Sequence, residues 1–72
     1  MTNIRFDIFK SSNVKLIVYN ILGKEITTLV NEKLNAGSYE VDWNASGYPS
    51  GVYFYKLQTE GFIETKKMVL MK

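Results

Sequence analysis

The side chains of this 72-residue chain that could do chemistry are seven carboxylates, a few serines and nine lysine or arginine residues. The chain has no histidine and no cysteine. The usual zinc ligands and the commonest proton-transfer side chain near neutral pH are therefore missing, as is any disulfide. We expect no enzyme activity, no bound metal and no cofactor.

The carboxylates could in principle form an acid/base pair, as in glycosidases. Five of them instead alternate with apolar residues in strand-like segments, which predicts a solvated face: Asp7, Glu25, Glu40, Asp42 and Glu64.

The serines and glycines also lack a catalytic context. Ser11, Ser12 and Ser50 are predicted to lie in turns, and no histidine is present to activate them. A Ser-Lys arrangement with Lys10 or Lys15 has no motif around it. The five glycines are scattered singly, so we expect turn positions and no phosphate-binding loop.

Charge and hydropathy argue against two classes of partner. A formal net charge of +2 with a single arginine, Arg5, is too small to indicate nucleic acid. The apolar runs are far shorter than the ~20 residues of a membrane-spanning helix. The first residues do not resemble a secretory signal peptide, so any such signal is expected upstream.

Short runs of β-branched and aromatic residues, separated by Gly, Asn, Ser and one Pro, predict a single all-β domain. Ile4, Phe6 and Ile8 alternate with polar residues, as in a half-buried strand. The six predicted strands are 2–8, 14–19, 24–34, 38–43, 52–59 and 62–71.

The segment 24–34 is ambiguous, because its apolar residues also recur at helical spacing. Its β-branched residues, Ile26, Thr27, Thr28 and Val30, favour a strand.

Turn residues indicate how the strands are connected. Asn20 to Gly23 suits a hairpin in which Gly23 adopts a left-handed conformation. Pro49 fits the second position of a turn closed by Gly51, and Glu60-Gly61 suits a two-residue hairpin loop.

The aromatic residues around position 50 have two interpretations. Tyr48, Tyr53, Tyr55, Phe54 and Trp43 could form a stacking platform for sugars or bases, which would make the chain an adhesive or carbohydrate-binding module. In so small a domain, however, aromatic bulk usually fills the core, and we favour that interpretation.

Two lysines, Lys66 and Lys67, interrupt the last apolar run. Lysines on an edge strand oppose aggregation, which is one explanation. The other is that a lysine-flanked terminal strand is recognised by a receptor through strand addition.

Three motifs in the same order resemble a known family: Tyr19 to Glu25 (YNILGKE), Ser50 to Tyr53 (SGVY) and Lys67 to Leu70 (KMVL). Together they resemble the type A C-terminal sorting domain of the type IX secretion system. The Gly-Val-Tyr-Phe-Tyr run is also similar to the Ig-like domain of flagellar hook-capping proteins.

The resemblance implies a small Ig-like β-sandwich of about six strands. Residues 1–72 would form one domain at the carboxyl end of a larger exported protein. That domain would be a non-catalytic label, recognised in the periplasm by the outer-membrane translocon. A sortase-like peptidase would then remove it from many family members, with the cargo at the cell surface or outside the cell.

The resemblance also assigns residues. Gly23 and Gly51 would carry the fold signature, and the tail would contact the translocon through Lys66, Lys67, Met68, Val69, Leu70, Met71 and Lys72. Family members usually begin with a further segment, so an edge of one sheet is expected to be missing here. Phe9 stands where the family often has proline. We therefore expect an exposed Phe9 and self-association into a homo-oligomer.

Overall fold

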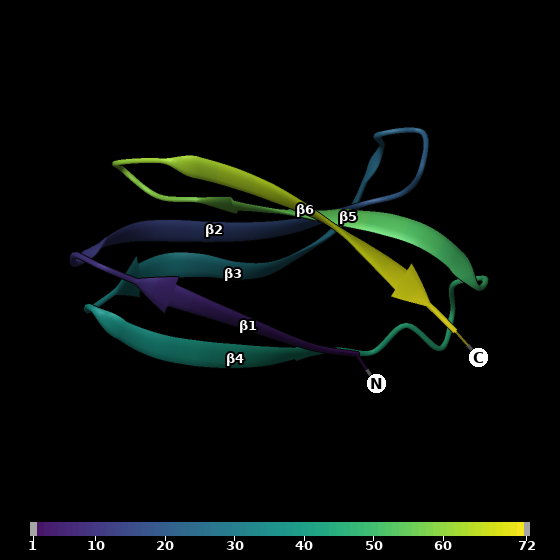
Figure 1. Cartoon of the computed structure of the whole chain (residues 1–72), viewed down its shortest axis with the longest axis horizontal. Helices are drawn as coiled ribbons and strands as arrows, with labels where there is room; N and C mark the ends of the chain where they lie inside the picture. The colour runs from purple at the N-terminus through teal and green to yellow at the C-terminus, as the bar shows by residue number, and fades with distance from the viewer. Residues whose placement is uncertain (1, 72) are drawn as a thin grey trace.

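The computed structural model describes residues 2–71 and shows an all-β chain of six antiparallel strands (Figure 1). This confirms the predicted fold class and number of strands, including a strand in the ambiguous segment 24–34. The strands are β1 (Thr2–Ile8), β2 (Ser12–Tyr19), β3 (Glu25–Leu34), β4 (Gly37–Trp43), β5 (Gly51–Gln58) and β6 (Ile63–Leu70).

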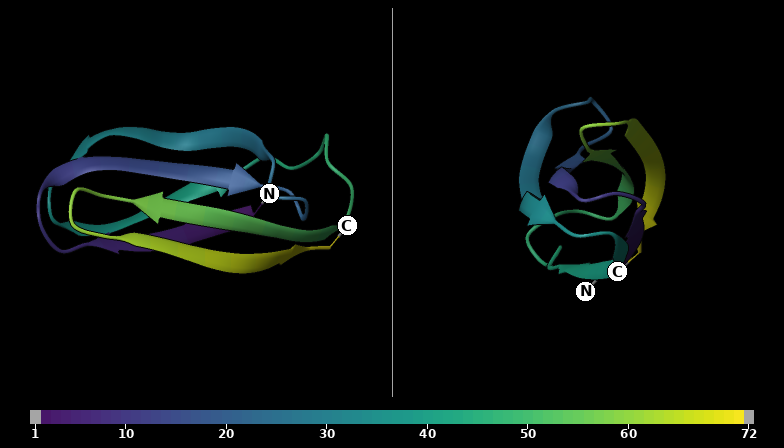
Figure 2. Two further views of the ribbon diagram at one scale, coloured as in Figure 1. Left: turned by 90° about the horizontal axis from the view of Figure 1, so that it is seen from above. Right: turned by 90° about the vertical axis from the view of Figure 1, so that its left-hand side faces the viewer.

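The strands form two sheets that face each other as a small β-sandwich (Figure 2). One sheet has the order β3-β2-β5-β6, and the other consists of β1 and β4. β2 is central, because it pairs with β3 on one side and with β5 on the other.

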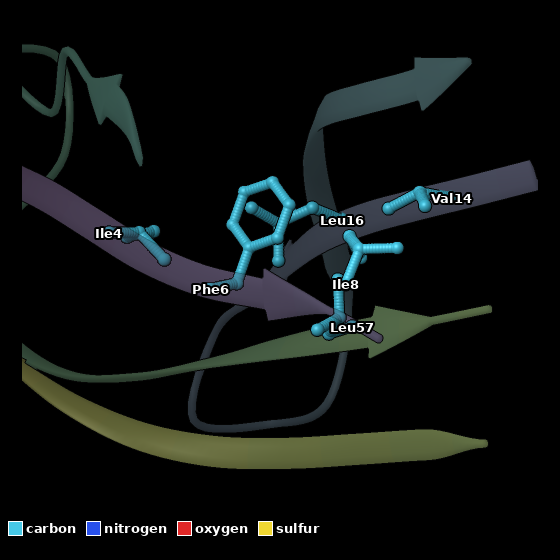
Figure 3. Packing of buried hydrophobic residues seen from close by; sticks show 6 residues of the cluster. All are labelled: Ile4, Phe6, Ile8, Val14, Leu16 and Leu57. Carbon is cyan, nitrogen blue, oxygen red and sulfur yellow. The ribbon is translucent and has the colours of Figure 1, made fainter. Parts of the chain in front are cut away.

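The core lies between the sheets in two clusters. Figure 3 shows the first cluster, in which alternate residues of β1 meet β2 and Leu57 of β5. Its buried members are Ile4, Phe6, Ile8, Val14, Leu16 and Leu57. The second cluster lies at the end of the sandwich where β6 ends. Its buried members are Val18, Trp43, Ala45, Tyr53 and Leu70.

The β2–β3 hairpin is stabilised by its own turn residues. The Asn20 side-chain Oδ1 accepts hydrogen bonds from the backbone N–H groups of Leu22 and Lys24 at 2.9 and 3.0 Å. Gly23 has φ +85°, which confirms the predicted left-handed conformation.

One local prediction was wrong, and the loop after β4 contains a turn that was not predicted. This hydrogen-bonded turn runs from Ala45 to Tyr48, since the N–H of Tyr48 donates to the carbonyl of Ala45 at 3.0 Å. The turn expected at Pro49 stays a prediction. Ser12 does not lie in a turn: it begins β2 and is buried, because its side chain falls on the same inward face as Val14 and Leu16.

Candidate functional site

The terminal strand β6 lies at the edge of the four-stranded sheet (Figure 1). It pairs with β5, and the described part of the chain provides no strand on its other side. An edge of this kind leaves backbone N–H and C=O groups available to an added strand.

The two faces of β6 differ. Register places Met68 opposite Tyr53 and Leu70 opposite Gly51, and both side chains pack against the second core cluster. Leu70 is only 8% exposed. These two residues anchor the end of the strand to the body of the domain.

The outward face of β6 carries Lys67 and Val69, which lie opposite Phe54 and Val52 of β5. Lys67 is exposed, and Val69 is 59% exposed. Met71, just beyond the strand, is 84% exposed. The chain thus presents a cation and two apolar side chains next to an anchored backbone.

Lys66 forms the ion pair of this strand. Its Nζ lies 3.0 Å from Oε1 of Glu64. The hydrogen bond to Glu64 and the attraction of its carboxylate raise the pKa of Lys66 above its ordinary value, and Tyr55 and Asp7 add smaller contributions. Because both side chains are at least half exposed, solvent screens the pair, and we assign it little stabilising effect.

A shallow groove of about 190 Å³ lies between β6 and β1. Glu64 and Lys66 line it from β6, while Arg5 and Asp7 line it from β1, and Phe6 contributes to its apolar part. The groove therefore runs beside the Glu64–Lys66 ion pair of the terminal strand.

Of the predicted recognition residues, the structure places Lys66 to Met71 on or directly after one edge strand. Lys72 lies outside the described residues. Val52 and Phe54 were not among the residues predicted for recognition, although they lie opposite Val69 and Lys67 on the outer face. Their alternation along β5 was visible in the sequence, but the register that sets them beside β6 was not.

The two predicted signature glycines occupy different places. Gly23 lies in the β2–β3 turn, whereas Gly51 begins β5 directly opposite Leu70, with φ +150°. A Cβ at either position would meet no atom within 4 Å. Backbone conformation, and not crowding, is therefore what favours glycine at both positions.

Phe9 is exposed, as expected, with 82% of its surface accessible. Its ring centroid lies 6.5 Å from that of Phe62, at the end of the molecule away from the end of β6.

The groups considered for chemistry are dispersed over the surface. The carboxylates of β1, β3, β4 and β6 are exposed, and the Glu40 carboxylate is 3.0 Å from Nε of Arg5. Among residues 2–71, no three His, Cys, Asp or Glu side chains are grouped so that they could hold a metal ion. In the same range, no helix has the length and hydropathy needed to span a bilayer.

The aromatic platform is largely part of the core. Trp43 and Tyr53 are 3% and 5% exposed, with ring centroids 5.2 Å apart. The Tyr53 hydroxyl donates to the carbonyl of Pro49 at 2.7 Å. Tyr48 packs on both rings and is half-buried.

One comparison with known proteins identifies a family. The model described as "Secretion system C-terminal sorting domain" matches residues 1–71, which is nearly the whole chain. No curated protein and no solved structure matches the chain.

Proposed function

We propose that this chain, which belongs to the secretion system C-terminal sorting domain family, is recognised by the outer-membrane translocon of the type IX system through its terminal strand. Membership of this family means that the chain is a sorting signal, which implies interaction with that secretion system. A type IX sorting tail also implies export across the outer membrane.

The observation that carries the proposal is the division of β6 into an anchored side and a displayed side. Met68 and Leu70 hold the strand on the core, while Lys67, Val69 and Met71 point outward. A receptor strand added to the free edge would gain backbone hydrogen bonds, and the alternating outward side chains would provide specificity.

The proposal also covers the place of the domain in its protein, its export and its removal. Residues 1–72 act as one domain at the carboxyl end of a larger exported protein. The domain crosses the periplasm with its cargo, and a sortase-like peptidase removes it at the cell surface. We further propose that its sandwich is related to the Ig-like domain of hook-capping proteins; two packed antiparallel sheets support this relationship. Families of sorting domains are non-catalytic in general, and no enzyme activity is part of the proposal.

The experiment fuses residues 1–72 to the carboxyl end of a periplasmic reporter in a bacterium with a type IX system. The expected result is reporter activity at the cell surface or in the medium. Deleting residues 67–72 should retain the reporter in the periplasm. Because this deletion also removes the buried Leu70, it is paired with Val69→Asp and Met71→Asp, which change only exposed side chains.

A matched control replaces an exposed apolar residue elsewhere. Leu22→Asp alters a side chain that is 88% exposed and lies in the β2–β3 turn. Export should continue in this control and stop in the β6 variants. Equal export by all variants would reject recognition through the outer face of β6. Retention of the unmodified fusion would reject sorting by residues 1–72.

A further inference from the structure

The end of the sandwich opposite the end of β6 contains a cavity of about 270 Å³. Residues of the β1–β2 and β5–β6 connections line it, and both connections are on the left in Figure 1. Phe9 and Lys10 contribute from the first connection, and Glu60 and Phe62 from the second. The sorting function uses none of these residues, so this site is independent of the proposed function.

The apolar side chains that line this cavity differ in exposure: Ile8 is buried, Phe62 is half-buried and Phe9 is exposed. Phe9 is 82% exposed, and its ring centroid lies 6.5 Å from that of Phe62. An exposed aromatic ring at the mouth of an open cavity is a candidate interaction surface.

A buried polar group at the cavity wall also lacks a partner. Ser12 is 6% exposed, and its Oγ makes no hydrogen bond within the described chain. A buried hydroxyl without a partner costs free energy. This oxygen is enclosed by the described chain itself, so it is not a contact for an incoming segment.

The rim of the cavity carries one cation and one anion. The Lys10 ammonium makes no ion pair within residues 2–71, and neither does the Glu60 carboxylate, which accepts only a long hydrogen bond from Asn13 at 3.3 Å. In a two-fold pair of such surfaces, the cation of each copy can face the anion of the other.

We propose that this end of the molecule is a two-fold dimer interface. The β1–β2 connection of each copy enters the cavity of the other. Phe9 fills its apolar part, and Lys10 pairs with the second copy's Glu60. The displayed residues of β6, at the opposite end, remain accessible in this dimer.

Sedimentation equilibrium of residues 1–72, from low to high micromolar concentration, tests the proposal. The expected result is a monomer–dimer equilibrium whose dissociation constant rises at least about tenfold in Phe9→Ser. Leu22→Ser is the matched control, since it removes an equally exposed apolar side chain from the other end. A monomer at all concentrations would overturn the proposal, as would equal weakening by both substitutions.

A charge exchange tests the two-fold arrangement itself. Lys10→Glu and Glu60→Lys should each weaken the homodimer, because like charges then meet. An equimolar mixture of the two variants should associate again, because each copy supplies the charge that the other lacks. Association of the mixture no stronger than that of either variant alone would exclude this interface. Lysozyme, an unrelated basic protein, should not associate with the Lys10→Glu variant. If it did, the association of the mixed variants would be nonspecific charge attraction, and the proposed interface would be rejected.

Discussion

Strands β2 and β6 belong to the same sheet and both have eight residues, yet they have opposite surroundings. In β2, five residues are buried: Ser12, Val14, Leu16, Ile17 and Val18. In β6, only Leu70 is buried. Both strands contain apolar and lysine residues, so composition alone does not explain the difference.

Position in the sheet explains it. A partner strand on each side and the β1–β4 sheet in front cover β2. β6 has one partner, and its outward residues meet no other layer in the described chain. A central strand is therefore constrained by packing, whereas an edge strand retains side chains that are free to serve recognition.

The largest effect that separates the two strands is expected for Leu16→Ala in β2. Leu16 is fully buried, and such truncations cost about 2–5 kcal/mol through lost burial and the cavity that remains. A domain of this size has only about 4–11 kcal/mol of stability, so urea denaturation followed by circular dichroism should show a severe loss. Val69→Ala in β6 should change stability by less than about 0.5 kcal/mol. Similar losses in both variants would contradict the comparison.

A smaller effect is expected for Leu70→Ala, which removes the anchor of β6. Leu70 is 8% exposed and packs in the second cluster, so we expect a cost of about 2 kcal/mol. Hydrogen exchange should accelerate in β6 more than in β2, because the terminal strand is released first. Met71→Ala, at an exposed site, should leave exchange unchanged. Uniform acceleration in both strands would show that β6 is not a separate unit.

The hairpins attached to the two strands should also differ. Gly23→Ala in the β2–β3 turn places a Cβ on a residue with φ +85°, at a cost of about 1 kcal/mol. Gly61→Ala in the β5–β6 turn should be nearly neutral, because Gly61 has no positive φ and open space around it. Thermal denaturation of the two variants measures the difference. A larger loss of stability in Gly61→Ala than in Gly23→Ala would contradict this expectation.

The smallest effect concerns the ion pair of β6. Glu64→Gln removes the main cause of the raised pKa of Lys66, so that pKa should fall toward its ordinary value. The pair stabilises the fold below the ordinary lysine pKa, and this contribution is lost as pH rises through the raised value. NMR titration of the Lys66 side chain measures the shift. Lys67, which makes no ion pair within residues 2–71, is the internal control.

Much of the fold was predictable because local patterns and packing agree. The alternation of Ile4, Phe6 and Ile8 correctly predicted their burial, and β-branched residues correctly predicted a strand at 25–34. The turn at Asn20–Gly23 was predictable because side-chain hydrogen bonds and glycine geometry act within a few residues.

The candidate site was predictable only in part. The lysine-flanked end of the chain was visible, but its exposure depends on which strand lacks a second partner. The sequence did not predict the burial of Ser12, because a polar residue between Ser11 and Asn13 has the composition of a turn. Its inward orientation follows from the pairing of Ser12 with Leu34, which lies far along the chain.

The sequence by itself determined the strands, the tight hairpins and the absence of histidine and cysteine chemistry, since these follow from side-chain type and from interactions between near neighbours. Only the tertiary structure decided that β6 is at the edge, that Phe9 borders a cavity, and that Ser12 is buried with no hydrogen-bond partner for its hydroxyl within residues 2–71. Those features depend on which distant segments pair and on how the two sheets pack together. No single segment of the sequence specifies that pairing.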